Sequence, residues 1–185
     1  MKTLFIQKNS SNNTFLPMFI VVLLITIDQF TKHLALINLK PLHSMEVIKE
    51  FFYLTFVENT GAAFGMFDGH IYIFVGIAIF VTIISAIFYD NPPSVNNLRN
   101  LTRFNDFNKF KKIRNLHNIT WNTALILLIS GALGNMIDRI VRGYVVDMFH
   151  FIFWGNDFAV FNMADIYVCI GTLLLSITIL FSESN

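Results

Sequence analysis

Four long apolar runs set the narrowest limits on how this chain can fold. They cover residues 15–39, 71–89, 121–137 and 163–181. A helix needs about 17–25 mostly apolar residues to cross a bilayer, and inside lipid its backbone hydrogen bonds must be made within the protein. With 55% hydrophobic and 14% charged residues, residues 1–185 are predicted to form one all-α membrane domain with four transmembrane helices.

The first apolar run could also be a cleaved signal peptide, because Lys2 and Lys8 precede it. No small-residue cleavage site follows the run, however, and the run is long enough for a complete span. We therefore expect this run to be a membrane anchor.

Lysine and arginine residues are distributed unevenly between the runs, and this predicts the orientation. Loops that stay in the cytoplasm retain these residues. Few lie in the outer connections, whereas the termini and the loop 91–118 hold most of them: Lys2, Lys8, Arg99, Arg103, Lys109, Lys111, Lys112 and Arg114. Both termini and this loop are therefore expected in the cytoplasm. The cluster "KFKKIR" could instead contact nucleic acid or anionic lipid, but loop retention is the simpler explanation and no nucleic-acid partner is expected.

With this orientation, polar residues from four separate stretches lie at one depth, at the outer membrane boundary. Polar residues at membrane depth are costly and commonly functional, so their convergence predicts a site. The set consists of Asn59, Asn135, Asp138, Arg139, Asp147 and Asp165.

Some residues near this set also have purely structural interpretations. Gly61 in "VENTGAAFG" and the glycines Gly131 and Gly134 would permit close packing. Asp138 and Arg139 could form an ordinary interfacial ion pair at a helix end.

Asp28 and Lys32 in "DQFTK" are spaced i, i+4 on one face of the first span. Inside a bilayer each would neutralise the other. We expect this to be a structural pair that supports the site.

Asp147 and Asp165 have no basic residue at a neighbouring helical position. Residues 144–153 are β-branched and aromatic, which favours an extended segment that would bring Asp147 over the helix end carrying Asp165. Two carboxylates in apolar surroundings cannot both ionise easily. One charged and one protonated carboxylate suit peptide hydrolysis by an aspartic mechanism, although proton-coupled transporters also keep carboxylates at such depths.

Other catalytic chemistry fits the sequence less well. The five histidines lack His-x-x-x-His spacing for zinc, and neither a metal nor another cofactor is expected. A Ser130–Lys32 dyad would place its serine in mid-span, where a peptide would hardly reach. His150 is close enough to Asp147 in sequence to support it, or could have an interfacial role.

The segments "DQFTK", "NTGAAFG", "GALGNMIDRIVRGYVVDMFHF" and "FNMAD", in this order across four spans, resemble the lipoprotein signal peptidases, the type II signal peptidases of bacteria. The resemblance implies an aspartic endopeptidase that cleaves diacylglyceryl-modified prolipoproteins just before the lipidated cysteine. It assigns catalysis to Asp147 and Asp165, and the Asp28–Lys32 pair matches the first span. Residues matching positions that support the site, or that contact substrate or the inhibitor globomycin, are Asn59, Gly61, Asn135, Asp138, Arg139 and Asn162.

The resemblance further implies a small extracytoplasmic β-like cradle and an amphipathic helix at the membrane interface, for which residues 45–59 are suited. It places the protein in the bacterial inner membrane, as a monomer whose partners are prolipoproteins and membrane lipids. Two alternatives remain open at this point. One is a proton-linked transporter using Asp28, Asp147 and Asp165 as a relay, and the other is a noncatalytic membrane scaffold.

Overall fold

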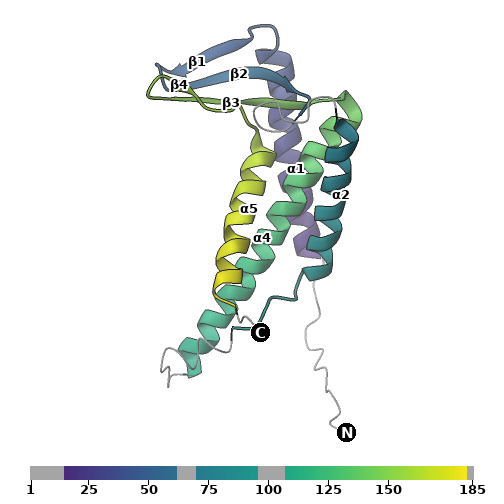
Figure 1. Ribbon diagram of the computed structural model, residues 1–185, viewed down its shortest axis with the longest axis vertical. Helices are drawn as coiled ribbons and strands as arrows, with labels where there is room; N and C mark the ends of the chain where they lie inside the picture. The colour runs from purple at the N-terminus through teal and green to yellow at the C-terminus, as the bar shows by residue number, and fades with distance from the viewer. Residues whose placement is uncertain (1–14, 62–69, 96–106, 183–185) are drawn as a thin grey trace.

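The computed structural model describes residues 15–61, 70–95 and 107–182. Its helices are α1 (Phe15–Leu34), which continues as a short π-helix, η1 (Ala35–Leu39), α2 (Ile71–Phe88), α4 (Phe107–Arg142) and α5 (Met163–Leu180). All four are long and apolar enough to cross a membrane, which confirms the four predicted spans. The helices run roughly side by side, with α4 in contact with α1, α2 and α5 (Figure 1).

Helix α4 is longer than the apolar run from which it was predicted. It begins at Phe107 rather than Trp121 and ends at Arg142, so residues 107–118, expected as loop, are its first turns. Apolarity marks where a helix can contact lipid, but a helix continues beyond the lipid as long as its own backbone hydrogen bonds are made. The sequence criterion therefore located the span and missed its extension.

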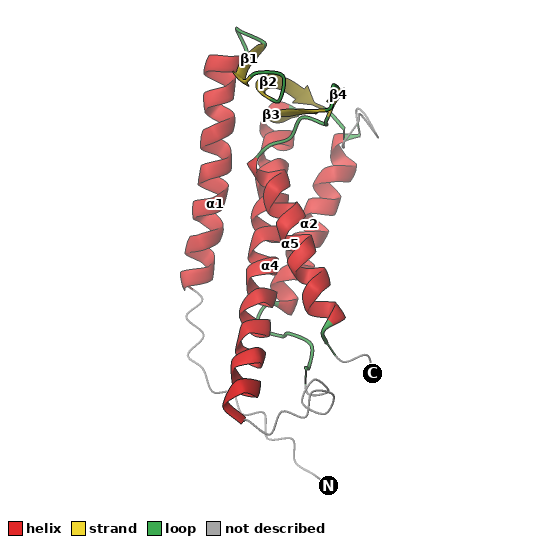
Figure 2. Cartoon of the chain, turned by 90° about the vertical axis from the view of Figure 1, so that its left-hand side faces the viewer, coloured by secondary structure: helices red, strands yellow, loops and turns green. Residues whose placement is uncertain are grey.

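A four-stranded antiparallel sheet lies across one end of the helices (Figures 1 and 2). Its strands, in spatial order, are β1 (Ser44–Ile48), β2 (Phe52–Asn59), β3 (Val145–Phe153) and β4 (Asn156–Asp157). The predicted β-like cradle and the extended segment around Asp147 are thus confirmed. Residues 45–59 lie in strands β1 and β2 and the turn between them, and the described part of this connection contains no interfacial helix. Residues 62–69 lie outside the described residues.

The connection from α4 to β3 is a tight turn at Gly143. Gly143 has φ +82°, a left-handed conformation that glycine adopts without the steric cost of a Cβ, and its N–H donates to the Arg139 carbonyl at 3.1 Å. This turn ends the helix and directs the chain into β3. Because β3 starts immediately afterwards, Asp147 is held close to the end of α4.

Small residues let the helices approach closely below the sheet. A Cβ on Gly131 would lie 2.5 Å from the Ala164 carbonyl oxygen, and one on Gly134 would lie 2.7 Å from Asp28 Oδ2. Both positions therefore require glycine, as expected from the small-residue pattern. Their effect is to bring α1 and α5 against the part of α4 that carries Asn135 and Asp138.

The described chain starts and ends on the side of the molecule away from the sheet (Figure 2). The start of α4, with Lys111, Lys112 and Arg114, lies on that side too. The other basic residues used to predict orientation, Lys2, Lys8, Arg99 and Arg103, lie outside the described residues.

Candidate active site

Asp147 is held in place by two amides. Strand β3 places it on the underside of the sheet, 1% exposed, where Asn59 Nδ2 donates to Oδ2 at 2.8 Å and Asn162 Nδ2 donates to Oδ1 at 2.6 Å. Burial raises the pKa of Asp147 to about 7, and the Asp165 charge adds to this rise, while the hydrogen bonds from Asn59 and Asn162 oppose it. Asp147 thus titrates near neutrality.

Asp165 occupies the first turn of α5. Its Oδ2 accepts a hydrogen bond from the backbone N–H of Asn162 at 3.1 Å, while Asn162 Oδ1 accepts one from the Asp165 N–H at 3.1 Å. This reciprocal arrangement is a capping box. The other carboxylate oxygen, Oδ1, accepts from Asn135 Nδ2 at 2.8 Å. A carboxylate at this position interacts favourably with the positive end of the helix dipole.

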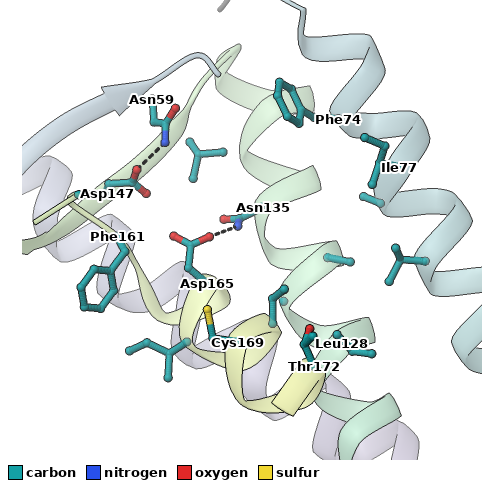
Figure 3. A pocket seen from close by; sticks show the side chains of 18 of the residues that line it. Asn59, Phe74, Ile77, Leu128, Asn135, Asp147, Phe161, Asp165, Cys169 and Thr172 are labelled. Atoms are coloured by element: carbon teal, nitrogen blue, oxygen red, sulfur yellow. Dashed lines mark hydrogen bonds between the residues drawn. The ribbon is translucent and has the colours of Figure 1, made fainter. Parts of the chain in front are cut away.

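Asn162 connects the two carboxylates. It is fully buried, caps α5 with its oxygen, and directs its Nδ2 group to Asp147 Oδ1 and, at 3.2 Å, to Asn135 Oδ1. Hydrogen bonds therefore link Asp147 through Asn162 to Asp165, and Asn135 bonds to both Asn162 and Asp165. Figure 3 shows the carboxyl groups of Asp147 and Asp165 on the same pocket, each with its amide partner.

The predicted Asp28–Lys32 pair is present, and Lys32 also reaches the site. Lys32 Nζ lies 2.9 Å from Asp28 Oδ2 and 3.2 Å from Asp138 Oδ2, and all three side chains are fully buried. Lys32 also donates to Asn135 Oδ1 at 2.9 Å. Since an ammonium group can only donate, it fixes the oxygen of the Asn135 amide on its own side and turns Nδ2 toward Asp165.

Asp138 joins this charged cluster to the sheet. Its Oδ2 accepts from the Val146 N–H at 3.0 Å, and its Oδ1 accepts from Gln29 Nε2 at 3.1 Å and pairs with Arg142. Sequence reasoning missed Gln29 and Arg142. The available signals were the position of Gln29 beside Asp28 and the i, i+4 spacing of Arg142 from Asp138.

Arg139 does not pair with Asp138, so the alternative of an interfacial Asp138–Arg139 pair is wrong. Consecutive helical residues point in different directions and do not face each other. Arg139 Nη2 instead donates to the Gly61 carbonyl at 3.0 Å, and the guanidinium lies over the Phe74 ring, 4.6 Å from its centroid. The Gly61 N–H donates to Asn59 Oδ1 at 3.0 Å, which leaves Nδ2 of Asn59 for Asp147.

His150 and Ser130 lie away from this hydrogen-bond set. His150 follows Asp147 by three residues on β3, so its side chain points to the opposite face of the strand. Its ring contacts Asp157 at 3.0 Å and Thr55 at 3.2 Å. The buried Ser130 hydroxyl donates to the Ile126 carbonyl at 2.8 Å. Among the described residues, no three His, Cys, Asp or Glu side chains are grouped to hold a metal ion.

A cavity of about 960 Å³ opens beside both carboxylates, between α2, α4 and α5. Its walls are mostly apolar and reach well down the helices, through residues such as Phe74, Ile77 and Leu128 (Figure 3). The polar groups Asn59, Asn135, Arg139, Asp147 and Asp165 gather at the sheet end. An apolar cavity with a few convergent polar groups is typical of a binding or active site.

The fold and the site together define a class: a multi-pass membrane protein that holds two hydrogen-bonded carboxylates at one end of an apolar cavity. Comparison with known families makes this specific. The family model described as "Signal peptidase (SPase) II" matches residues 20–104 and 107–181. The chain therefore belongs to the signal peptidase II family and is a peptidase of that family.

Individual relatives and solved structures agree with the family model. The chain is 38% identical to the lipoprotein signal peptidase of Clostridioides difficile (strain 630), over 90% of this chain and 95% of that one. It is 33% identical to the lipoprotein signal peptidase of Staphylococcus aureus (strain bovine RF122 / ET3-1), over 90% and 88%. A solved chain described as a bacterial membrane enzyme structure at 2.3 Å resolution is 32% identical, with a TM-score of 0.68 over 90% of this chain and 88% of that one.

Proposed function

We propose that this protein is an aspartic endopeptidase that cleaves diacylglyceryl-modified prolipoproteins just before the lipidated cysteine. The observation that carries the proposal is the pair formed by the buried Asp147 and the partly buried Asp165, joined through Asn162. Burial raises the pKa of Asp147 to about 7, so one carboxyl group holds a proton near neutral pH. This is the state an aspartic mechanism requires.

The surroundings of the two carboxylates assign them different roles. Asp165 accepts from Asn135 and from the Asn162 backbone at the N-terminus of α5, where a negative charge is favourable. Asp147 lies buried beneath the sheet, and its pKa is raised mainly by that burial. Asp165 is therefore the base and Asp147 the acid.

The reaction follows from these roles. Asp165 takes a proton from a water molecule, and the water oxygen attacks the carbonyl carbon of the scissile peptide bond. Protonated Asp147 donates to the carbonyl oxygen as negative charge develops there. The tetrahedral intermediate then collapses, the C–N bond breaks, and the leaving nitrogen receives a proton from the pair. The products are a carboxyl group on the signal peptide and an amine on the lipidated cysteine.

Arg139 supplies a further contact for the substrate. Its Nη2 donates to the Gly61 carbonyl, but its Nε is buried and has no acceptor among the described residues. A buried donor without an acceptor is costly. Since Arg139 lines the cavity, this Nε is placed to donate to a backbone carbonyl of the bound peptide.

The cavity and the membrane together suit a lipid-anchored substrate. The apolar signal peptide lies along the cavity walls, and the acyl chains of the modified cysteine stay in lipid and hold the scissile bond at the level of the carboxylates. Anchoring the substrate in this way lowers the entropic cost of orienting it. One chain supplies both carboxylates and their partners, which supports a monomeric enzyme formed by residues 1–185 as one unit.

The distribution of lysine and arginine supports an orientation with both termini in the cytoplasm. The sheet and the carboxylates then lie on the outer side of the bacterial inner membrane, where prolipoproteins carry their modified cysteine.

A proton relay across the membrane is less well supported. Asp28 Oδ1 accepts a hydrogen bond at 2.9 Å from the N–H of Ala164, the residue immediately before Asp165. Asp28, Asp147 and Asp165 therefore gather at one end of the helices, and over the described residues they do not form a series across the membrane. Such gathering favours local chemistry over transport.

The test is a gel-shift assay with a purified diacylglyceryl-modified prolipoprotein and purified enzyme in detergent. Asp147→Asn and Asp165→Asn are each expected to abolish conversion while the protein remains folded, because an amide cannot cycle a proton. Asp157→Asn makes the same change on the same sheet, at a largely exposed side chain that bonds only His150 among the described contacts, and should cleave like wild type.

Conversion at the wild-type rate by either site variant would overturn the aspartic assignment. If folded wild-type protein shows no conversion, the substrate assignment fails, and proton flux in liposomes then tests the transport alternative.

A further inference from the structure

The free end of the sheet carries a group of exposed aromatic side chains that the proposed chemistry does not use. We define the aromatic end as Phe51, Phe153, Trp154 and Phe158. These side chains are 40%, 40%, 96% and 51% exposed. Their rings are in mutual contact, with centroid distances from Phe153 of 5.7 Å to Phe51, 6.2 Å to Trp154 and 6.1 Å to Phe158.

The turn at this end holds a tryptophan in an unfavourable backbone conformation. Trp154 and Gly155 connect β3 to β4 with φ values of +51° and +79°. Two-residue hairpin turns of this kind favour Asn-Gly or Asp-Gly, because a bulky side chain at positive φ is strained. A tryptophan that is strained and 96% exposed gains little from packing within the protein, where its ring contacts that of Phe153. The free energy that offsets the backbone strain at Trp154 must therefore come from the surroundings of the protein.

The position of the aromatic end shows what surrounds it. The sheet reaches sideways past α5 (Figure 1), and α5 exposes Leu173, Ile177 and Leu180 on its outer surface. In a membrane, such a surface contacts lipid. The aromatic end therefore stands above lipid, at the level where the spans end.

The chemistry of the aromatic end matches the membrane–water interface. Tryptophan and other aromatic residues are enriched there, because their rings are apolar and the indole N–H is polar. Charged side chains lie at the same end: those of Lys49, Glu50 and Asp157 are 84%, 82% and 77% exposed. These charges oppose insertion into the hydrocarbon core and restrict the aromatic end to headgroup depth.

We infer that the aromatic end of the sheet is a membrane-interface anchor, seated among the lipid headgroups of the leaflet on the sheet side. Phe153 and Asp147 lie on the same face of strand β3, six positions apart, which corresponds to about 20 Å of extended chain. The ring of Phe153 stacks on that of Phe151, and Phe151 stacks on Phe161, with centroids 6.0 Å and 5.9 Å apart. The anchor therefore fixes the height of Asp147 relative to the bilayer.

The fluorescence of Trp154 tests this inference directly and independently of catalysis. The chain contains two tryptophans, Trp121 and Trp154, and Trp121 is 7% exposed. Wild type and Trp154→Phe are reconstituted into phosphatidylcholine bilayers, and their difference spectrum isolates Trp154. The lipids carry bromine either close to the glycerol or close to the chain ends, and acrylamide serves as an aqueous quencher.

The expected result is a Trp154 emission at shorter wavelength than that of free tryptophan in water, quenched more by shallow than by deep bromine. Emission typical of water, with strong acrylamide quenching and no bromine quenching, would overturn the inference. Short-wavelength emission that neither bromine position quenches would also overturn it, because protein would then cover the aromatic end. Stronger quenching by deep bromine would exclude the interfacial depth.

A second variant separates the group from the single tryptophan. Phe153→Ser combined with Phe158→Ser keeps Trp154 and removes its aromatic neighbours. The Trp154 emission should move to longer wavelength and lose part of its shallow bromine quenching. An unchanged spectrum in this double variant would contradict an anchor formed by the whole aromatic end.

Discussion

The two halves of the helical bundle are held together in different ways. Near the sheet, Asp28, Lys32 and Asp138 are charged groups with fully buried side chains. Away from the sheet, Trp121 and Leu125 of α4 pack against apolar neighbours from α2 and α5. Lipid is as apolar as leucine, so packing in the second half depends on shape. The half near the sheet depends instead on matched charges. Removing one charged partner is costly because it leaves the other charge buried and uncompensated, and an uncharged side chain of similar size does not restore the lost stability.

The largest effect is expected from breaking the charged half. Lys32→Met leaves Asp28 and Asp138 without the ammonium group that contacts both, and should lower the free energy of unfolding by about 3–5 kcal/mol. Folded yield and melting temperature in detergent measure this. Lys40→Met removes an ion pair between half-exposed side chains and should change neither. A Lys32→Met protein with a wild-type melting temperature would show that charge matching does not hold this half.

A change at Asn162 separates catalysis from stability within the charged half. Serine caps helices about as well as asparagine, so Asn162→Ser should keep the α5 cap but lose the Nδ2 bonds to Asp147 and Asn135. We expect kcat roughly a hundredfold lower and a smaller fall in melting temperature than in Asn162→Ala. Asn162→Ala, which also removes the cap, should cost about 1 kcal/mol of stability in addition. Near wild-type kcat in Asn162→Ser would mean that the link between the carboxylates is dispensable.

The apolar half should respond more weakly to truncation. Leu125 is 3% exposed, and Leu125→Ala should lower stability by about 2 kcal/mol, the low end for a buried leucine, because leucine also lies in lipid when the helices separate. Leu125→Met conserves volume and should have a smaller effect. Melting temperature and activity per folded molecule are the measurements. A loss larger than that of Lys32→Met would reverse the comparison between the two halves.

The next prediction concerns the pH dependence of stability. The pKa of Asp147 is raised from 3.8 to about 7, so between these values the folded protein binds more protons here than the unfolded chain. Asp147 therefore stabilises the fold below about pH 4, and this contribution falls as pH rises to about 7. Between about pH 4 and pH 7, the melting temperature of wild type should therefore fall more with rising pH than that of Asp147→Asn, which lacks this titrating group. Parallel wild-type and variant profiles would contradict a raised pKa.

The same pKa predicts the pH dependence of activity. With protonated Asp147 as the proposed acid, wild-type kcat should fall as pH rises above about 7. Initial rates in the gel-shift assay, measured between pH 5 and pH 9 on enzyme shown to stay folded, check this. A rate that rises throughout this range would show that the proposed roles of Asp147 and Asp165 are reversed, or that the two residues do not have these roles.

Much of this architecture could be predicted from the sequence, because lipid imposes strong rules. A span must be long and apolar, so the four helices were apparent, and uncompensated carboxylates in such a chain are conspicuous, so Asp147 and Asp165 were identified. The strand around Asp147 followed from its β-branched and aromatic residues. These inferences depend on local composition and spacing alone.

Other features depend on three-dimensional contacts and were not predictable. The sequence does not reveal that Lys32 on α1 turns the Asn135 amide on α4 toward Asp165 on α5, since this requires the relative rotation of three helices. It also does not reveal that Arg139 reaches Gly61, which is far away in the chain.

The position of Asn162 has a consequence for biosynthesis. Asp147 precedes α5, while Asn162 and Asp165 belong to the start of α5, the last helix of the described residues. During synthesis the chain carries one carboxylate of the pair without the other until α5 enters the membrane and docks against α4. Because the α5 cap and the link between the carboxylates are the same side chain, we expect the docking of α5 and the assembly of the carboxylate pair to be one event.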